Sequence, residues 1–129
     1  MTYCLDVEAV IEINQDVTEG NTVVLQQGQL ESALGQPLQT FGGIDLYPTV
    51  VEKAAVLLRG VIAAHAFMDG NKRTAWLSCM TFLRLCGLRL MDLSWEVAGP
   101  FVLSVESGAT SVQEAAVWLL ERLEDPDLS

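Results

Sequence analysis

The sequence predicts an all-α fold formed by one domain that spans residues 1–129. Two apolar segments, residues 49–67 and 73–86, carry hydrophobic side chains nearly all round a helical wheel, which is typical of helices buried on most sides. Ser111 and Glu114 have the spacing of a capping box ahead of a third apolar run. With 50% hydrophobic and 19% charged residues, a chain of 129 residues suits one folded domain and is not typical of disorder.

The first third of the chain predicts two short helices and a hairpin-like excursion. Asp6 can cap a helix that runs to about Asp16, and residues 16–24 then have the composition of a loop. A second short helix is expected over residues 28–36. Residues 37–48 contain a glycine pair flanked by strand-like residues, which predicts an irregular or hairpin-like segment. The apolar side of the first helix is formed by Val7, Val10 and Ile11.

The remaining helix boundaries follow from proline, glycine and serine. Pro48 suits the first position of the helix that carries the first apolar segment. Gly87 is a natural left-handed stop after the second segment. Ser94 can cap a helix over residues 95–107, although we expect Pro100 to kink or delay it. The result is an all-α domain in which two central helices are joined by a short polar turn.

The charge of the chain excludes several classes of partner. A net charge of −10, from 7 basic and 17 acidic residues, leaves no broad basic face for nucleic acid or for an anionic membrane. We therefore expect neither to be a direct partner. The opening stretch "MTYCLDVEAVIEIN" has no basic start and is interrupted by acidic residues, so it predicts neither a signal peptide nor a membrane span.

The three cysteines are expected to be reduced. If Cys79 and Cys86 share a helix, they lie roughly 10 Å apart along its axis, which is too far for a disulfide. Together with Cys4 they suit thiols of a cytoplasmic protein. No Cys/His spacing suits zinc.

The stretch "HAFMDGNKRTAW", residues 65–76, is a polar turn between the two central helices. A purely structural interpretation is available for it. Asp-Gly is good turn chemistry, Asn71 is a good helix cap, and His65 would end a helix where a cation is favoured.

The same turn also predicts an anion-binding catalytic site. A helix that begins near Asn71 presents unpaired N–H groups and partial positive charge, to which Lys72 and Arg73 add cations. Asp69 offers a hard oxygen ligand for Mg²⁺ that is already bound to phosphates. His65 can fold back towards the same anion and suits general-base catalysis near neutral pH. A base, a metal ligand and an anion hole together suit the transfer of a phosphorus-centred group.

This stretch resembles the signature of the Fic/Doc family, roughly His-x-Phe-x-Asp/Glu-Gly/Ala-Asn-Gly/Lys-Arg. The flanking stretches "TFGGIDLYP" and "FLRLCG" resemble the Doc (death-on-curing) branch, and the similarity runs from about Val7 to Gly87. The resemblance implies a compact Fic/Doc helical bundle with a small flap beside the catalytic turn. The matching positions are His65, Phe67, Asp69, Gly70, Asn71, Lys72 and Arg73.

The resemblance implies a role for each of these residues. His65 would be the base that activates a target hydroxyl, Phe67 an inward core anchor, and Asp69 the ligand of the metal. Residues 40–48 would be the flap that aligns a target peptide by strand addition. The phosphate cradle would be formed by Asn71, Lys72, Arg73 and the backbone of Gly70.

Two positions depart from the nucleotide-transferring Fic enzymes and agree with the Doc branch. Lys72 stands where those enzymes usually have Gly, and Trp76 stands where they have a second Arg that grips the terminal phosphates. The resemblance to Doc implies that ATP, with Mg²⁺, lies reversed and presents its γ-phosphate to His65. The implied reaction is phosphorylation of a Ser/Thr of a protein, with elongation factor Tu as the target and translation arrest as the consequence.

An antitoxin partner is implied as well. Fic proteins often carry an inhibitory helix with the pattern Ser/Thr-x-x-x-Glu-Gly/Asn, but here only Glu19 precedes Gly or Asn, and Gln15 stands four positions before it. Restraint by a Phd-like antitoxin is therefore expected. Two alternatives remain: a Fic-type enzyme that transfers AMP to a protein hydroxyl, and a non-catalytic module that docks an antitoxin or a DNA-bound repressor complex. The intact catalytic motif disfavours the second alternative.

Overall fold

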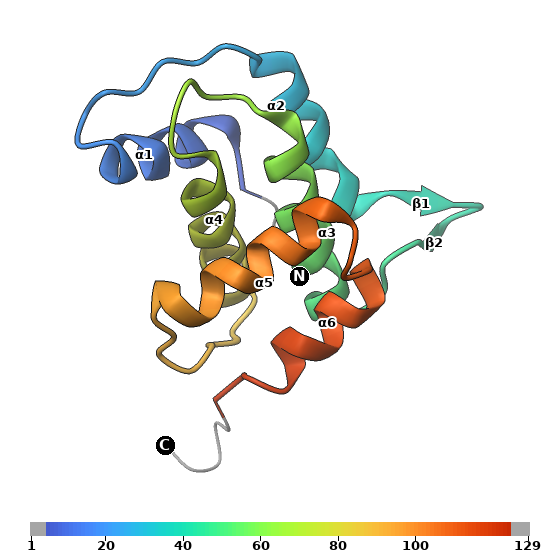
Figure 1. Cartoon of the computed structure of the whole chain (residues 1–129). Coiled ribbons are helices and arrows are strands. Elements are labelled where there is room, and N and C mark those ends of the chain that lie inside the picture. Colours follow the sequence, from blue (N-terminus) through green and yellow to red (C-terminus); the bar gives the residue numbers. More distant parts are fainter. Residues whose placement is uncertain (1–4, 125–129) are drawn as a thin grey trace.

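The computed structural model describes residues 5–124 and is built from helices, as the sequence predicts (Figure 1). The elements are α1 (Val7–Val17), α2 (Gln27–Gly35), the 3₁₀ helix η1 (Gln36–Leu38), β1 (Thr40–Phe41), β2 (Ile44–Asp45), α3 (Val50–Ala64), α4 (Asn71–Leu85), α5 (Trp95–Ser107) and α6 (Val112–Leu120). No helix within the described residues is long and apolar enough to cross a membrane.

Helix α3 is the centre of the bundle. It packs against α2, α4, α5 and α6, and ten of its fifteen residues are buried. Helix α4 lies beside it and contacts α1 on another side. The all-round apolar pattern of the two central segments is therefore explained, because helices surround both of them. The short turn joins the end of α3 to the start of α4 and therefore lies close to α1, which packs against α4.

Several helix ends confirm the sequence interpretation. Asp6 caps α1 by accepting a hydrogen bond from the N–H of Ala9 at 2.8 Å, and Ser111 and Glu114 form both hydrogen bonds of a capping box at the start of α6. Gly87 has φ +84° just after α4, and the N–H of Leu88 reaches back to the carbonyl of Leu83 at 2.9 Å. This is the Schellman arrangement in which a left-handed residue closes a helix.

Two expectations about proline are wrong. Helix α3 begins at Val50, not at Pro48, because the Thr49 hydroxyl caps it by accepting a hydrogen bond from the N–H of Glu52. Helix α5 begins directly after Ser94 and continues past Pro100, so the expected delay is wrong, while the expected kink stays a prediction. The carbonyl that Pro100 leaves unpaired belongs to Glu96, and both residues are exposed, so water can satisfy that carbonyl.

The predicted hairpin is present and projects from the bundle (Figure 1). Strands β1 and β2 pair antiparallel, with Phe41 opposite Ile44, and Gly42 and Gly43 both have positive φ in the two-residue turn. Phe41 is 80% exposed and Ile44 74% exposed. These paired residues, 40–45, are the hairpin part of the expected segment 40–48, and from here on we call them the flap.

A buried lysine fixes the base of the flap. The Nζ atom of Lys53 in α3 lies 3.2 Å from Oδ2 of Asp45 and also donates to the carbonyl of Tyr47. The Lys53 side chain is only 4% exposed, so its charge depends on these two partners. The flap is therefore tied to the central helix at its base, while its apolar tip stands in solvent.

The described cysteines behave as expected. Cys79 and Cys86 are both free, and burial raises the pKa of the Cys79 thiol to about 12. A thiol with so high a pKa remains protonated and unreactive at neutral pH. Cys4 lies outside the described residues.

Candidate active site

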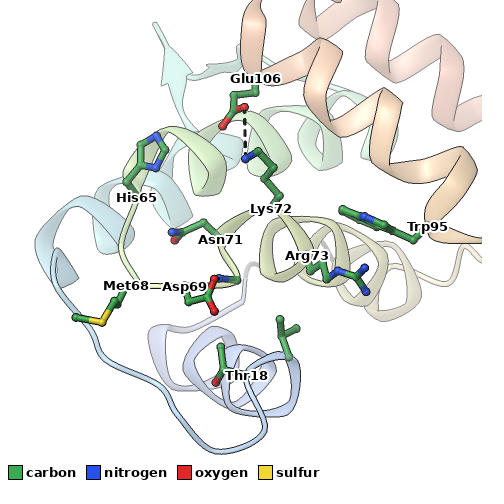
Figure 2. Close-up of a pocket in the computed structure, with 11 residues that line it drawn as sticks. Thr18, His65, Met68, Asp69, Asn71, Lys72, Arg73, Trp95 and Glu106 are labelled. Atoms are coloured by element: carbon green, nitrogen blue, oxygen red, sulfur yellow. Dashed lines mark hydrogen bonds and ion pairs between the residues drawn. The ribbon is translucent and has the colours of Figure 1, made fainter.

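The turn begins where His65 ends helix α3. His65 adopts the left-handed conformation, with φ 43° and ψ 47°, and its N–H donates to the carbonyl of Ile62 at 3.3 Å. This conformation is uncommon for a residue other than glycine, although histidine adopts it more often than most. It turns the chain away from the helix axis and leaves the imidazole exposed on the pocket side of the turn (Figure 2).

The next residues are held by main-chain pairing with the loop that follows α1. The N–H of Leu25 donates to the carbonyl of Ala66 at 2.7 Å, and the N–H of Met68 donates to the carbonyl of Val23 at 3.0 Å. Between them Phe67 is 2% exposed, which confirms it as an inward core anchor. The exposed polar groups of the turn therefore stand on a backbone that is fixed on its inner side.

Asn71 does not cap helix α4, contrary to the expectation from sequence. The N-cap is Gly70, and Asn71 is the first helical residue. Its side chain instead reaches back to Phe67, donating to the carbonyl at 2.8 Å and accepting from the N–H at 3.1 Å. The side-chain amide thus holds the turn in shape, while the helix start is left without a side-chain cap and open to an external anion.

Gly70 is required by both its conformation and its surroundings. Its φ is +76°, and a Cβ atom added there would lie 2.9 Å from Cγ1 of Val17 and 3.2 Å from Cγ2 of Thr18. Val17 is the last residue of α1, and Thr18 is its C-cap. The glycine therefore permits α1 to pack directly against the start of α4.

Asn14 in α1 supports the turn from below, and sequence reasoning missed it. Its side chain is fully buried and donates to the carbonyl of Asp69 at 2.9 Å and to the hydroxyl of Thr74 at 3.0 Å. The side-chain oxygen of Asn14 accepts from the hydroxyl of Thr22 at 2.9 Å. Its position in the sequence could have indicated this role. Asn14 is a polar residue on the otherwise apolar side of α1, where a buried side chain needs hydrogen-bond partners.

The structure brings all six predicted site residues to one pocket of about 470 Å³ (Figure 2). The N–H of Thr74 is the first in α4 to donate along the helix, to the carbonyl of Gly70, so the three preceding N–H groups lie at the open end. Lys72 and Arg73 extend from this end, and both are exposed. The predicted residues that line the pocket are His65, Asp69, Gly70, Asn71, Lys72 and Arg73.

Two residues of α5 complete the pocket wall. Oε1 of Glu106 lies 3.9 Å from Nζ of Lys72, and the guanidinium of Arg73 lies 4.7 Å from the ring centroid of Trp95. Neither contact has a local sign in the sequence, because α5 follows the turn by more than twenty residues. Both cations of the turn are thus oriented by partners from another helix.

Trp76 points into the core. It is 4% exposed and meets Phe101 and Trp118 in edge-to-face contacts, with ring centroids 6.2 Å apart in each case. The place of the second Arg of nucleotide-transferring Fic enzymes is therefore taken by a packed aromatic ring. Trp76 does not line the pocket of His65.

The residues present suit a magnesium ion that arrives with phosphates. One oxygen of the exposed Asp69 carboxylate, Oδ1, accepts the N–H of Gly70 at 2.8 Å. Within the described part of the chain, no group of three or more His, Cys, Asp or Glu side chains is placed to hold a metal. Mg²⁺ accepts one or two carboxylates and completes its shell with phosphate oxygens and water, so Asp69 fits such an ion and would bind it only with the nucleotide.

The fold and the pocket define a class: compact helical proteins in which a histidine and the start of a helix face one pocket across a short turn. Comparison with known proteins agrees with this class. The Fic/DOC family matches residues 4–83. The protein named Toxin Doc from Mycolicibacterium smegmatis is 41% identical over 90 residues, which cover 70% of this chain and 69% of that protein. The chain belongs to the Fic/Doc family.

Proposed function

We propose that this protein is a Doc-type toxin that transfers the γ-phosphate of ATP to a Ser or Thr hydroxyl of a cytoplasmic protein. The observation that carries the proposal is the meeting of His65 with the open start of α4 and with Lys72 in one pocket. Membership of the Fic/Doc family supports the broader statement that the protein is an ATP-using transferase. The kinase reaction and its target are the finer steps proposed here.

Each residue has a task in the proposed reaction. His65 accepts the proton of the target hydroxyl, and the hydroxyl oxygen forms a bond to the γ-phosphorus. The bond from that phosphorus to the bridging oxygen of ADP breaks, and ADP leaves with the electron pair. The N–H groups at the start of α4, Lys72 and Arg73 stabilise the charge on the transferring group. Asp69 would hold Mg²⁺, which neutralises phosphate charge when it is bound.

The choice of kinase over AMP transferase depends on Lys72 and Trp76. Lys72 adds a cation where an AMP transferase usually has glycine, and it stands beside the helix start. Trp76 is packed against two aromatic rings and offers no group to the terminal phosphates. A pose that presents the α-phosphate to His65 therefore lacks its usual grip on the β- and γ-phosphates.

We infer the partner and the target from the similarity to the protein named Toxin Doc. The name Toxin Doc describes a toxin, and toxins of this kind require an antitoxin. We propose a Phd-like antitoxin as the partner and elongation factor Tu as the target, with translation arrest as the result. The exposed flap, with Phe41 and Ile44 at its tip, supports a protein substrate because it can pair with an extended peptide.

Isotope labelling tests the reaction. Purified protein is incubated with elongation factor Tu and with ATP labelled in either the α- or the γ-phosphate. We expect label from γ-labelled ATP only, with a mass gain of ~80 Da for the target. Label from α-labelled ATP, with a gain of ~329 Da, would establish AMP transfer instead. A His65→Asn variant is the control, and neither label should be transferred by it.

A further inference from the structure

Arg59 lies where the neighbouring helices leave α3 uncovered. Among the described residues from Lys53 to Ala64, Arg59 and Ala63 are exposed and all the others are buried. These two residues are four positions apart, so they lie on one side of the helix. The bundle therefore leaves a single strip of α3 open to solvent along this stretch, and that strip carries a cation.

Arg59 lies between two hollows in the surface. One, of about 250 Å³, is formed between α2 and α3, and it reaches Ala64, the residue directly before His65. The other, of about 300 Å³, is formed between α3 and the segment that joins α5 to α6, and it reaches Tyr47, two positions after the flap. Arg59 lines both hollows. Since α3 runs from the flap to the turn (Figure 1), the hollows mark a path from the base of the flap, past Arg59, towards His65.

The charge of Arg59 is not neutralised by its surroundings. Arg59 makes no hydrogen bond, ion pair or ring contact with any residue that the structure describes. The other described residues that line the two hollows are uncharged, although the chain has 17 acidic residues. Five other basic residues do contact a carboxylate or a tryptophan ring within the described part of the chain: Lys53, Lys72, Arg73, Arg89 and Arg122. The guanidinium of Arg59 is therefore available to an acidic group from another molecule.

We propose that Arg59 binds an Asp or Glu side chain of the target protein and that this contact helps to select the target. The inference rests on the proposed function, to which it adds a residue that determines specificity. Arg59 does not line the pocket of His65, so it lies outside the phosphate cradle. A guanidinium suits a carboxylate because it can donate two parallel hydrogen bonds to the two oxygens.

The geometry of α3 sets the distance between the acidic residue and the hydroxyl that is phosphorylated. Arg59 precedes His65 by six positions, which corresponds to roughly 9 Å along the helix axis. An extended peptide advances roughly 3.3 Å per residue. The carboxylate should therefore lie about three residues from the acceptor hydroxyl, on the side of the peptide that pairs with the flap.

Peptide binding without nucleotide tests the proposal separately from phosphate transfer. Each fluorescent peptide has a single Ser in a strand-forming sequence rich in Val and Thr, with one Glu at a varied distance from the Ser, and fluorescence anisotropy gives its affinity. We expect Glu about three residues from the Ser to bind about threefold to fivefold more tightly than Gln at the same position, at low ionic strength. Arg59→Gln should remove this difference. Arg59→Glu should reverse it, so that Lys is preferred at that position, and a purely structural role of Arg59 would not produce such a reversal.

Arg84→Gln is the matched control. Arg84 is also exposed and has no partner among the described residues, but it lies in the last turn of α4 and outside both hollows. Its replacement changes the net charge by the same amount, so the preference for Glu should be retained. A wild-type protein with no preference for Glu at any position would overturn the proposal. So would a preference that survives in folded Arg59→Gln.

Phosphate transfer gives a second measurement. With the proposed target protein, Arg59→Gln should raise the KM for the target about threefold to fivefold, while kcat and the affinity for ATP stay unchanged. If the target is phosphorylated and its KM is the same for Arg59→Gln, the inference fails and the proposed function stands. If the preference for Glu is found but no label from ATP reaches a protein, the proposed function fails and the carboxylate site stands.

Discussion

The side-chain amide of Asn14 donates a hydrogen bond to the main-chain carbonyl of Asp69 at a distance of 2.9 Å, across 55 positions of the chain. The same amide nitrogen donates to the hydroxyl of Thr74, so one buried group links Asp69 in the turn with the first turn of α4. Asn14 does not line the pocket. It positions the residues that do, and in particular the segment that presents the Asp69 carboxylate.

Replacement of Asn14 by alanine should destabilise the protein and loosen the turn. The change leaves the carbonyl of Asp69 and the hydroxyl of Thr74 without their buried donor, which typically costs about 1–3 kcal/mol for each group. We expect a loss of about 2–4 kcal/mol in the free energy of unfolding, measured with urea, together with weaker Mg²⁺-dependent ATP binding. Gln15→Ala, at the exposed neighbour, is the control and should have little effect on either quantity. An unchanged unfolding free energy for Asn14→Ala would contradict the role of the amide.

Alanine at Gly70 should cost more than alanine at Gly87. Both glycines have similar positive φ values, +76° and +84°, so the backbone strain of about 1–2 kcal/mol is shared. Only at Gly70 does the new Cβ meet neighbours, with Val17 Cγ1 at 2.9 Å, whereas at Gly87 nothing lies within 4 Å. We therefore expect Gly87→Ala to lower the unfolding free energy and leave ATP binding intact, and Gly70→Ala to reduce both. Equal effects of the two substitutions would show that the contact with α1 is unimportant.

Substitution of His65 by asparagine should abolish phosphate transfer without unfolding the protein. Asparagine accepts the left-handed conformation that His65 adopts, so it removes the base and adds little strain. Loss of general-base catalysis typically lowers a rate by ~10²–10⁴. The measurement is transfer of label from γ-labelled ATP, with ATP affinity as a separate reading that we expect to be retained. Transfer at the wild-type rate by this variant would exclude His65 as the base.

Neutralising Glu106 should strengthen nucleotide binding. The Glu106 carboxylate lies 3.9 Å from the ammonium of Lys72 within the pocket. There it would repel the phosphates of a bound nucleotide and partly neutralise the charge of Lys72. Since the pair is partly exposed, the effect is small, and we expect Glu106→Gln to tighten ATP binding about twofold to fivefold at low ionic strength. The gain should shrink in high salt, which screens such charges. Glu96→Gln, on the same helix and outside the pocket, is the matched control; an identical change in both variants would mean that only net charge matters.

The capping box of α6 makes one contribution to stability dependent on pH. Hydrogen bonds from the Ser111 backbone and side chain lower the pKa of Glu114 below its usual value of 4.5. A carboxylate with a lowered pKa in the folded state stabilises the protein above its unfolded pKa, and this stabilisation is lost as the pH falls through the folded pKa. The difference in melting temperature between the wild-type protein and Glu114→Gln should therefore be largest near neutral pH and shrink below pH 4.5. A difference that grows on acidification would contradict the assignment.

The helices could be predicted from the sequence because their determinants are local. The apolar stripe that starts at Val7, the cap at Asp6 and the left-handed Gly87 each act within a few residues. The two proline errors have a local cause as well, since the Thr49 side chain caps α3 and the carbonyl freed by Pro100 belongs to Glu96, an exposed residue. Local rules compete with one another at such positions, and the sequence does not show which of them prevails.

The candidate site was predictable only in part. The turn itself places its six residues within nine positions, so their meeting follows from chain connectivity. The partners of these residues come from elsewhere: Asn14 from α1, and Trp95 and Glu106 from α5. Asn71 is the clearest example. It is a residue type that often caps helices, but it follows the N-cap Gly70 by one position, and its side chain binds the backbone of Phe67 instead. Such contacts depend on how whole helices pack.

The three tryptophans of this chain also give it a built-in optical readout. Trp76 is buried and Trp118 is stacked on Phe101 with ring centroids 3.8 Å apart, so the emission of both should change most when the helices separate. Trp95 is partly exposed, and its ring contacts Arg73, a residue that we propose binds an arriving phosphate. Intrinsic fluorescence of the unmodified protein should therefore follow nucleotide capture through Trp95 and global unfolding through the other two indoles.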